Sequence, residues 1–180
     1  MRDSDQWQQM RFYASDGHAE VLWVRPEADT YHVLNVPGWL YGVSVGSRVR
    51  GHLGERWLEF DEVVETSSGA TVRLYIPAEA QITPASRLYL ERILPDCRVL
   101  RLCIGPATFF DPQVVAIHVR DRNDWNTRFA DYLNGLIDEG LLQLWEVGDP
   151  DAYPLDEPEE AGEYGELVHP RPTPNRTELI

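Results

Sequence analysis

Short apolar runs, separated by glycine, proline and charged residues, fill the first part of the chain. They predict strands at residues 19–26, 30–36, 46–54 and 56–65, because runs of this length that are rich in Val, Leu, Tyr and Trp are typical of strands. Each run is short and ends at a glycine or a charged residue. The pattern therefore predicts a small β-barrel-like meander over residues 19–69, preceded by an N-terminal extension at residues 1–18.

From residue 70 onward, strand-like runs alternate with helical periods. Strands are expected at 70–77, 97–105, 113–120 and 141–147, and helices at 83–95 and 124–140. The first helix has Thr83 as N-cap and Pro84 at N1, and it is expected to end at Pro95. The order of elements predicts a ferredoxin-like (split βαβ) antiparallel sheet over residues 70–148, with two helices on one face, in an α+β protein.

Strand alternation assigns side chains to the two faces of this second sheet. One class is apolar throughout and should lie under the helices: Val72, Leu74, Ile76, Leu100, Leu102, Ile104, Val115, Ile117, Val119, Leu142 and Leu144. The other class is mixed: Arg73, Tyr75, Cys97, Val99, Arg101, Cys103, Val114, Ala116, His118, Gln143 and Trp145. Such a face can stack bases, as single-stranded RNA readers do. Packing of the N-terminal part on this face is favoured instead, because the chain is acidic and lacks an aromatic ribonucleoprotein motif.

The net charge of the chain limits the classes of molecule that it is expected to bind. The net charge is −14, and the basic residues are sixteen arginines with no lysine, so Schiff-base and lysine general-base chemistry are excluded. Acidity makes duplex DNA an unfavourable partner and a cationic protein a favourable one. Residues 149–180 carry nine acidic and two basic side chains and six prolines. This segment is expected to be a mostly disordered acidic tail. If it has a function, the expected one is that of an arm that binds a basic surface.

Neither a membrane segment nor a secretory leader is expected. No run of about 18 apolar residues occurs, and the first residues lack an apolar stretch, so we expect a soluble cytoplasmic protein with no membrane partner. Cys97 and Cys103 fall in one predicted strand, which would separate them by about 20 Å, too far for a disulfide.

Residues with catalytic potential are few. The five histidines include no pair at metal-ligand spacing, so no metal, cofactor or catalytic residue is assigned. The run 56–65 places Glu59, Asp61, Glu62 and Glu65 on an acidic strand. Glu59 and Asp61 would lie about 7 Å apart on one face, which is near the spacing of a general acid and base. A solvated acidic strand face is the favoured interpretation.

Several short motifs carry a resemblance to a known family. They are Leu22–Trp23, Asn35–Pro37, Tyr41–Ser44, Gly46–Val49 and Ser68–Ala70. Together they resemble the bacterial family called domain of unknown function 4265 (DUF4265), closely over residues 19–76 and more loosely to about residue 148. Ser47 and Ala70 replace an Asp and a His of the family pattern, which weakens any expectation of catalysis.

The glycine-rich stretch 32–51 is interpreted as a barrel corner. Asn35 is expected to bond its own backbone, Gly38 to permit a positive φ, and Gly42 and Gly46 to let the chain reverse. Trp39 and Tyr41 would then cap the barrel end, or alternatively form an aromatic lip for a ligand or partner.

Three functional hypotheses follow. The first is a non-enzymatic binding protein whose acidic strand and tail engage a cationic protein partner, with an immunity-type role that masks a basic toxin. The second is a small-molecule or RNA sensor that uses the mixed face through Arg73, Tyr75, Arg101, His118 and Trp145. The third is an enzyme that uses Glu59 and Asp61.

Overall fold

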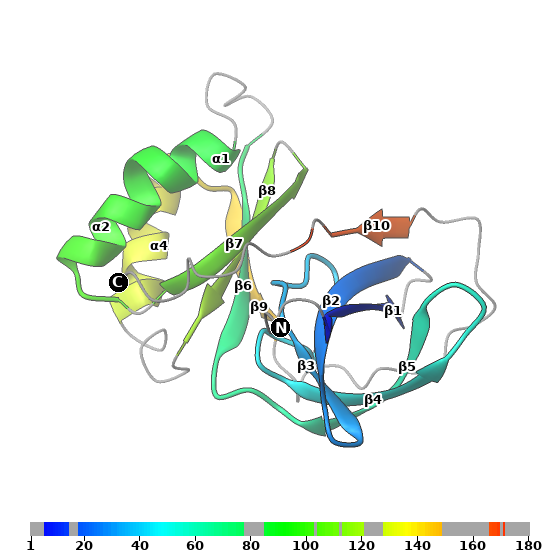
Figure 1. Ribbon diagram of the computed structural model, residues 1–180. Coiled ribbons are helices and arrows are strands. Elements are labelled where there is room, and N and C mark those ends of the chain that lie inside the picture. The colour runs from blue at the N-terminus through cyan, green and yellow to red at the C-terminus, as the bar shows by residue number, and fades with distance from the viewer. Residues whose placement is uncertain are drawn as a thin grey trace.

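The first part of the chain folds into a closed barrel. The structure is a computed structural model that describes residues 6–14, 18–77, 85–102, 104–111, 113–120, 128–148, 166–169 and 171. The barrel strands are β1 (Gln8–Tyr13), β2 (Ala19–Glu27), β3 (Thr30–Val33), β4 (Arg48–Leu53) and β5 (Leu58–Glu65). The strand order is β1-β5-β4-β3-β2, and β1 also pairs with β2, which closes the barrel. Figure 1 shows it beside a second layered part.

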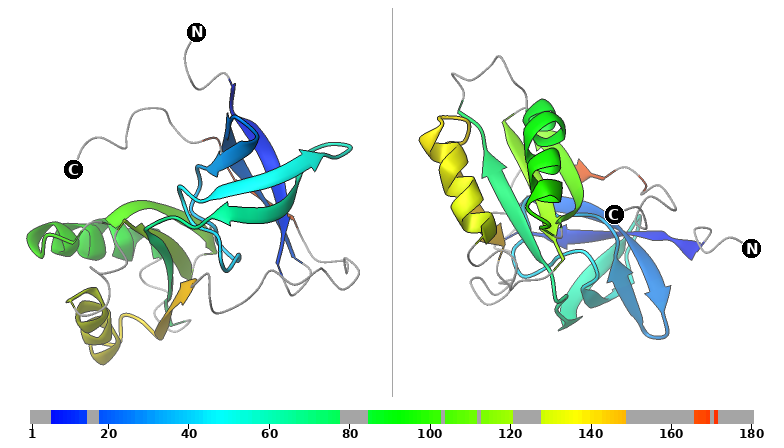
Figure 2. Two further views of the ribbon diagram at one scale, coloured as in Figure 1. Left: turned by 90° about the horizontal axis from the view of Figure 1, so that it is seen from below. Right: turned by 90° about the vertical axis from the view of Figure 1, so that its left-hand side faces the viewer.

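The second part is a four-stranded antiparallel sheet with order β7-β8-β6-β9. Its strands are β6 (Ala70–Tyr75), β7 (Ile104–Asp111), β8 (Val114–Val119) and β9 (Leu144–Gly148). One helical run comprises α1 (Ala85–Leu88), a π-helical stretch (Tyr89–Ile93) and α2 (Leu94–Val99), and the other is α4 (Ala130–Asp138). Both runs lie on the side of the sheet that faces away from the barrel (Figures 1 and 2). The structure thus confirms a mixed α+β architecture with a barrel.

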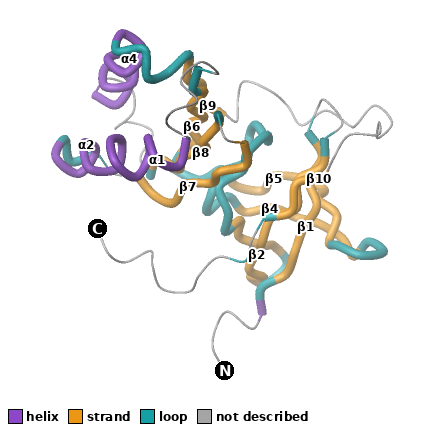
Figure 3. Tube along the Cα trace, turned by 90° about the horizontal axis from the view of Figure 1, so that it is seen from above, coloured by secondary structure: helices purple, strands orange, loops and turns teal. Residues whose placement is uncertain are grey.

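Each part has its own apolar core. In the barrel, Met10, Phe12, Leu22, Val24 and Val49 are buried together, and the Phe12 and Phe60 rings stack at 4.8 Å. In the second part, the predicted helix-facing class is largely confirmed, since Val72, Leu74, Ile76, Leu102, Ile104, Val115, Ile117, Val119 and Leu142 share one cluster with side chains of both helical runs. Figure 3 shows the helices gathered at one side and the strands of both parts at the other.

The first expected helix continues past its predicted end. The Leu94 N–H donates to the Tyr89 carbonyl, five residues back, and Pro95 is the second residue of α2. A helix start is where proline is tolerated, because the missing N–H is not needed there. The strand expected at 97–105 is therefore wrong: Cys97 lies buried in α2, and β7 begins only at Ile104. β7 then runs on to Asp111, through residues that no predicted strand includes. Cys103 lies outside the described residues.

The two chain ends also differ from expectation. Residues 8–13, assigned to an N-terminal extension, form β1, which is integral to the barrel. In the tail, β10 (Glu166–Val168) pairs in parallel with β2, and His169 is buried. The expectation of disorder is wrong for these residues, while residues 151–165 lie outside the described ones. None of the helices described is long and apolar enough to span a membrane.

Candidate functional site

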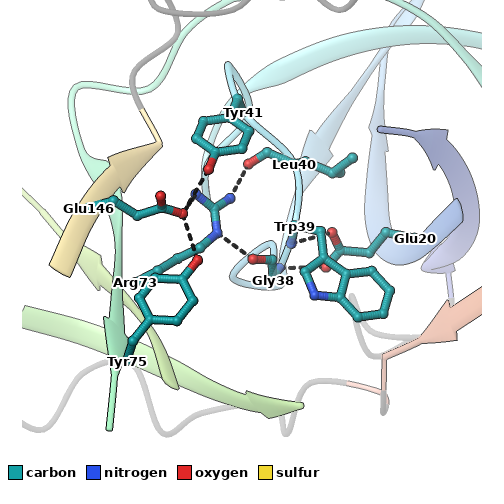
Figure 4. Close-up of polar contacts among 8 residues, drawn as sticks. All are labelled: Glu20, Gly38, Trp39, Leu40, Tyr41, Arg73, Tyr75 and Glu146. Carbon is teal, nitrogen blue, oxygen red and sulfur yellow. Dashed lines mark hydrogen bonds and ion pairs between the residues drawn. The ribbon is translucent and has the colours of Figure 1, made fainter. Parts of the chain in front are cut away.

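A loop of the barrel packs against the sheet and forms the centre of the polar network in Figure 4. It connects β3 to β4 and includes Gly38, Trp39, Leu40 and Tyr41. Gly42 and Gly46 have φ of 76° and 84°, as the predicted chain reversal requires. Asn35 differs from expectation, because its Oδ1 accepts the Trp23 N–H of β2 at 2.8 Å. Gly38 is not among the residues with positive φ in the described part of the chain.

Arg73 of β6 holds this loop from the sheet side. Its side chain is 2 % exposed, its Nε donates to the Gly38 carbonyl, and its Nη2 donates to the Leu40 carbonyl. The guanidinium carbon also lies 4.4 Å from the centre of the Tyr41 ring, a cation–π contact. The face predicted to be mixed is therefore covered by the barrel loop at this residue, as the favoured packing interpretation requires.

Glu146 of β9 collects three donors at one carboxylate oxygen. The hydroxyls of Tyr41 and Tyr75 donate to it at 2.7 and 2.8 Å, and Arg73 Nη1 lies 3.4 Å away. Burial, followed by the hydrogen bond to Glu146, raises the pKa of Tyr75 well above its ordinary value. Tyr75 consequently stays protonated and donates from β6 to β9 within the sheet, while the Tyr41 hydroxyl donates from the barrel loop to the same carboxylate.

Glu20 of β2 holds the same loop from the barrel side. Its side chain is fully buried, and its two carboxylate oxygens accept the N–H groups of Gly38 and Trp39 at 2.6 and 3.1 Å. The Nε2 atom of His169 lies 2.5 Å from Glu20 Oε1, and both side chains are 1 % exposed. The loop is thus gripped at its N–H groups by Glu20 and at its carbonyls by Arg73.

The segment around His169 is fixed to β2 by several contacts. The His169 N–H donates to the Val21 carbonyl at 3.1 Å, and Trp23 Nε1 donates to the His169 carbonyl at 3.1 Å. The guanidinium of Arg171 lies 5.6 Å from the ring centre of Trp7 and 5.4 Å from that of Trp23. We call residues 166–169 and 171 the C-terminal strap.

Each carboxylate of the acidic strand has a basic partner on a neighbouring strand. Glu59 accepts two hydrogen bonds from Arg11 at 3.0 and 2.5 Å, and Asp61 lies 2.7 Å from a ring nitrogen of His52. Glu62 pairs with Arg50, and Glu65 pairs with Arg48 at 2.8 Å. The register of β4 and β5 also shifts between Arg50 and Gly51. The regular alternation assumed for Glu59 and Asp61 is therefore interrupted.

The mixed face is only partly as predicted. Arg73, Tyr75, Ala116 and His118 lie on it, whereas Arg101 follows α2 in an exposed turn at a φ of 57°. Trp145 lies on the helix face, because it pairs with Leu74 and packs on the helix-side core. Because Arg73 and His118 are buried and Arg101 and Trp145 lie elsewhere, these residues do not form one open base-stacking surface.

His118 lies buried opposite Thr71 on the barrel side of the sheet. Burial, and to a lesser extent the nearby Arg120 charge, lowers the pKa of His118 to about 4. Its Nδ1 and the Thr71 hydroxyl have no hydrogen-bond partner among the residues described. A methyl group at Gly69 would clash with the His118 ring and lie 2.5 Å from the Val119 carbonyl oxygen. Glycine in the Ser68–Ala70 motif is thus required by packing.

The aromatic candidates of the loop lie at the junction between the two parts. Tyr41 points to Glu146 and Arg73 (Figure 4), and the half-buried Trp39 tilts against the His18 ring at 5.1 Å. Neither location tests the aromatic-lip hypothesis directly, but Tyr41 has a clear structural role.

Sequence reasoning missed Glu20, Glu146 and His169. A signal was present for the two glutamates, since each interrupts an apolar strand, in "AEVLWV" and "LLQLWEV". A carboxylate within such a strand needs buried donors. His169 carried no comparable signal, because its surroundings are rich in proline and acid.

The network has the chemistry of a clamp. Its carboxylates accept hydrogen bonds from backbone N–H groups, hydroxyls, an imidazole and a guanidinium, all of which belong to the chain itself. Within the described residues, no group of three or more His, Cys, Asp or Glu side chains is placed to hold a metal ion.

Comparison with known proteins supports the fold and places the chain in a family. A hypothetical protein from Neisseria gonorrhoeae has a similar solved structure, with a TM-score of 0.56 and 12 % sequence identity, covering 78 % of this chain and 92 % of that one. Among curated proteins, none matches. Residues 20–144 match the family described as "Domain of unknown function (DUF4265)", and the chain therefore belongs to the DUF4265 family.

Proposed function

We propose that this protein is a non-enzymatic binding protein that engages a cationic protein partner, in an immunity-type role that masks a basic toxin in a bacterial cytoplasm. The observation that carries the proposal is the distribution of charge. In residues 149–165, between β9 and β10, the sequence has seven acidic side chains and no arginine. Complementary charge speeds the association of such pairs.

The carboxylates of strand β5 are less suited to bind the cationic partner than the sequence suggested. Its four carboxylates already pair with Arg11, His52, Arg50 and Arg48, as described above. Carboxylates that already have a basic partner leave little uncompensated field for a cationic protein. The unbalanced acids between β9 and β10 are better suited to steer a basic surface toward the protein.

We also propose that residues 70–148 belong to the ferredoxin-like type. The strand order β7-β8-β6-β9, with a helical run after β6 and another after β8, supports this assignment. It leaves the function open, since one fold hosts many activities.

The test begins with affinity capture from the native host lysate, followed by association kinetics of the captured protein at low and high salt. The expected partner is basic, and its association rate should fall by about tenfold or more when salt is raised, because exposed charges steer the encounter. A neutral or acidic partner, or association that ignores salt, would contradict the proposal.

Two variants with equal charge change locate the steering charge. One neutralises Asp156, Glu157, Glu159 and Glu160 to the corresponding amides, and the other neutralises Glu59, Asp61, Glu62 and Glu65 in the same way. Both raise the net charge equally, so any bulk effect is shared. The first should slow association more than the second, since the β5 carboxylates are already paired.

A further inference from the structure

We infer that the edge of β2 at Ala19–Val21, together with Glu20, Trp7 and Trp23, is a binding groove for an extended segment of a partner protein. The segment that fits carries a histidine and, two residues later, an arginine. The C-terminal strap occupies this groove in cis. The inference stands independently of the proposed function, since it uses the strap contacts alone.

The backbone of β2 offers an edge at this place. β3 pairs with β2 only along Val24–Glu27, so the edge beside Ala19–Val21 lies beyond the end of β3. The strap pairs there in parallel, from Glu166 opposite Ala19 to Val168 opposite Val21. Added strands of this kind gain affinity from main-chain hydrogen bonds, and pockets for side chains provide specificity.

The groove contacts two side chains of the strap specifically, those of His169 and Arg171. Glu20 accepts His169 Nε2 in a fully buried site, where a carboxylate selects a hydrogen-bond donor or a cation. Trp7 and Trp23 flank the guanidinium of Arg171, and aromatic faces attract such a group. The spacing of these two sites defines the pattern His-x-Arg.

The strap is an imperfect occupant. His169 Nδ1 and Trp7 Nε1 are buried without a hydrogen-bond partner among the described residues, and Val168 is 45 % exposed. Its pairing with β2 covers only Glu166–Val168. A partner segment that offers an acceptor to Trp7 Nε1, or that pairs with β2 over a longer strand, would bind better than the strap.

The connection to the strap makes it an intramolecular competitor. Seventeen residues, 149–165, join β9 to β10, and a tether of this kind gives the attached segment an effective concentration on the order of millimolar. A free segment of equal intrinsic affinity therefore binds the intact chain only weakly. A substitution that weakens the binding of the strap to β2 should make the groove accessible to a free segment.

The experiment measures fluorescence anisotropy of a labelled peptide with the sequence of residues 164–173, "YGELVHPRPT". The full-length variant His169→Pro loses both the N–H donor to Val21 and the imidazole on Glu20. It should bind this peptide at least about tenfold more tightly than the intact chain does, because the competitor is weakened. A control peptide with alanine in place of His169 and Arg171 should bind about tenfold more weakly.

A second variant, Arg171→Ala, changes only an exposed strap residue and serves if His169→Pro fails to fold. It should also bind the peptide more tightly than the intact chain. Equal binding of the two peptides, or no binding to a folded variant, would overturn the inference. Sedimentation of the intact chain should show a monomer; a dimer that the peptide dissociates would assign the groove to a second copy's strap and overturn it as well.

Discussion

Arg73 is an arginine in a site with almost no access to solvent. It is among the largest fully buried side chains, and it satisfies the Gly38 and Leu40 carbonyls while approaching Glu146. Arg73→Met keeps an apolar stem of similar length but leaves those acceptors without their donor. We expect a loss of about 3 kcal/mol, which corresponds to a melting temperature lower by about 6–12 °C.

Arg87→Met is the matched control for that change. Arg87 forms an i,i+4 ion pair with Glu91 on α1 and the following π-helical stretch, and its side chain is 57 % exposed. Thermal unfolding of both variants should show a far smaller change for Arg87→Met, within about 0.5 kcal/mol. Similar losses for the two variants would mean that the loop does not depend on the Arg73 guanidinium.

His118 makes stability depend on pH. In the folded chain burial lowers its pKa to about 4 from 6.5, so the unfolded state binds more protons between these two values. Stability should therefore fall as pH is lowered from 6.5 to 4, by at most about 1.4 kcal/mol per pH unit. Urea unfolding of His118→Gln should show a flatter slope in this window than the parent chain.

The comparison must be one of slopes, because the substitution can shift stability equally at every pH. Measurements at pH 7.5 give that constant offset. If His118→Gln and the parent lose stability in parallel between pH 6.5 and 4, the buried imidazole is not the group responsible.

At the scale of elements, the pairing of β6 with β8 requires a residue without a Cβ atom at position 69. Gly69, just before β6, lies against the His118 ring and the Val119 carbonyl. Gly69→Ala should destabilise the protein by about 1–3 kcal/mol, because the contact includes backbone that cannot move aside. In contrast, Gly135→Ala in α4 meets nothing within 4 Å and should stabilise it by about 0.5–1 kcal/mol. Equilibrium urea unfolding measures both changes.

The sequence predicts elements well where a period is long and bounded by turns. The strands β2, β4, β5, β6 and β8 and the helix α4 lie within or close to their predicted ranges. Prediction fails where tertiary contacts decide the structure. Pro95 lies in the first turn of α2, after the π-helical stretch, and does not end the helical run. In β9 the two sheet faces are exchanged relative to the prediction, so that Trp145 lies on the helix side.

The candidate site is less predictable than the fold. Packing of the barrel on the sheet face that carries Arg73 is predicted from the sequence, because the chain is acidic and lacks an aromatic ribonucleoprotein motif. The partners of Arg73 and Glu20 are not, because backbone groups of one loop bind both side chains and backbone groups carry no sequence signal. His169 reaches Glu20 across 149 positions of the chain, which no local pattern can indicate.

For the whole molecule, the strap should contribute measurably to stability. Deleting residues 166–180 removes the imidazole from the buried Glu20 carboxylate and opens the β2 edge. We expect a melting temperature several degrees lower, because a buried carboxylate would lose one of its partners. A mostly disordered tail, as composition alone predicts for residues 149–180, would make no such contribution.

Deleting only residues 172–180 removes none of the strap contacts. That shorter deletion should keep the melting temperature within about a degree of the parent value. Equal melting temperatures for the full chain and the chain that ends at Gly165 would show that the strap contacts add nothing to stability.

The contact between Glu20 and His169 also constrains the order in which the chain completes its fold during synthesis. Because 149 positions separate the two residues, a ribosome working at about 5–20 residues per second delivers His169 about 7 to 30 s after Glu20. Once β5 has been synthesised, and until His169 follows, a nascent barrel has a Glu20 carboxylate without its imidazole partner and an open β2 edge. The ribosome-bound chain is therefore a natural state in which the groove is empty, and a partner present at translation meets it before the strap does.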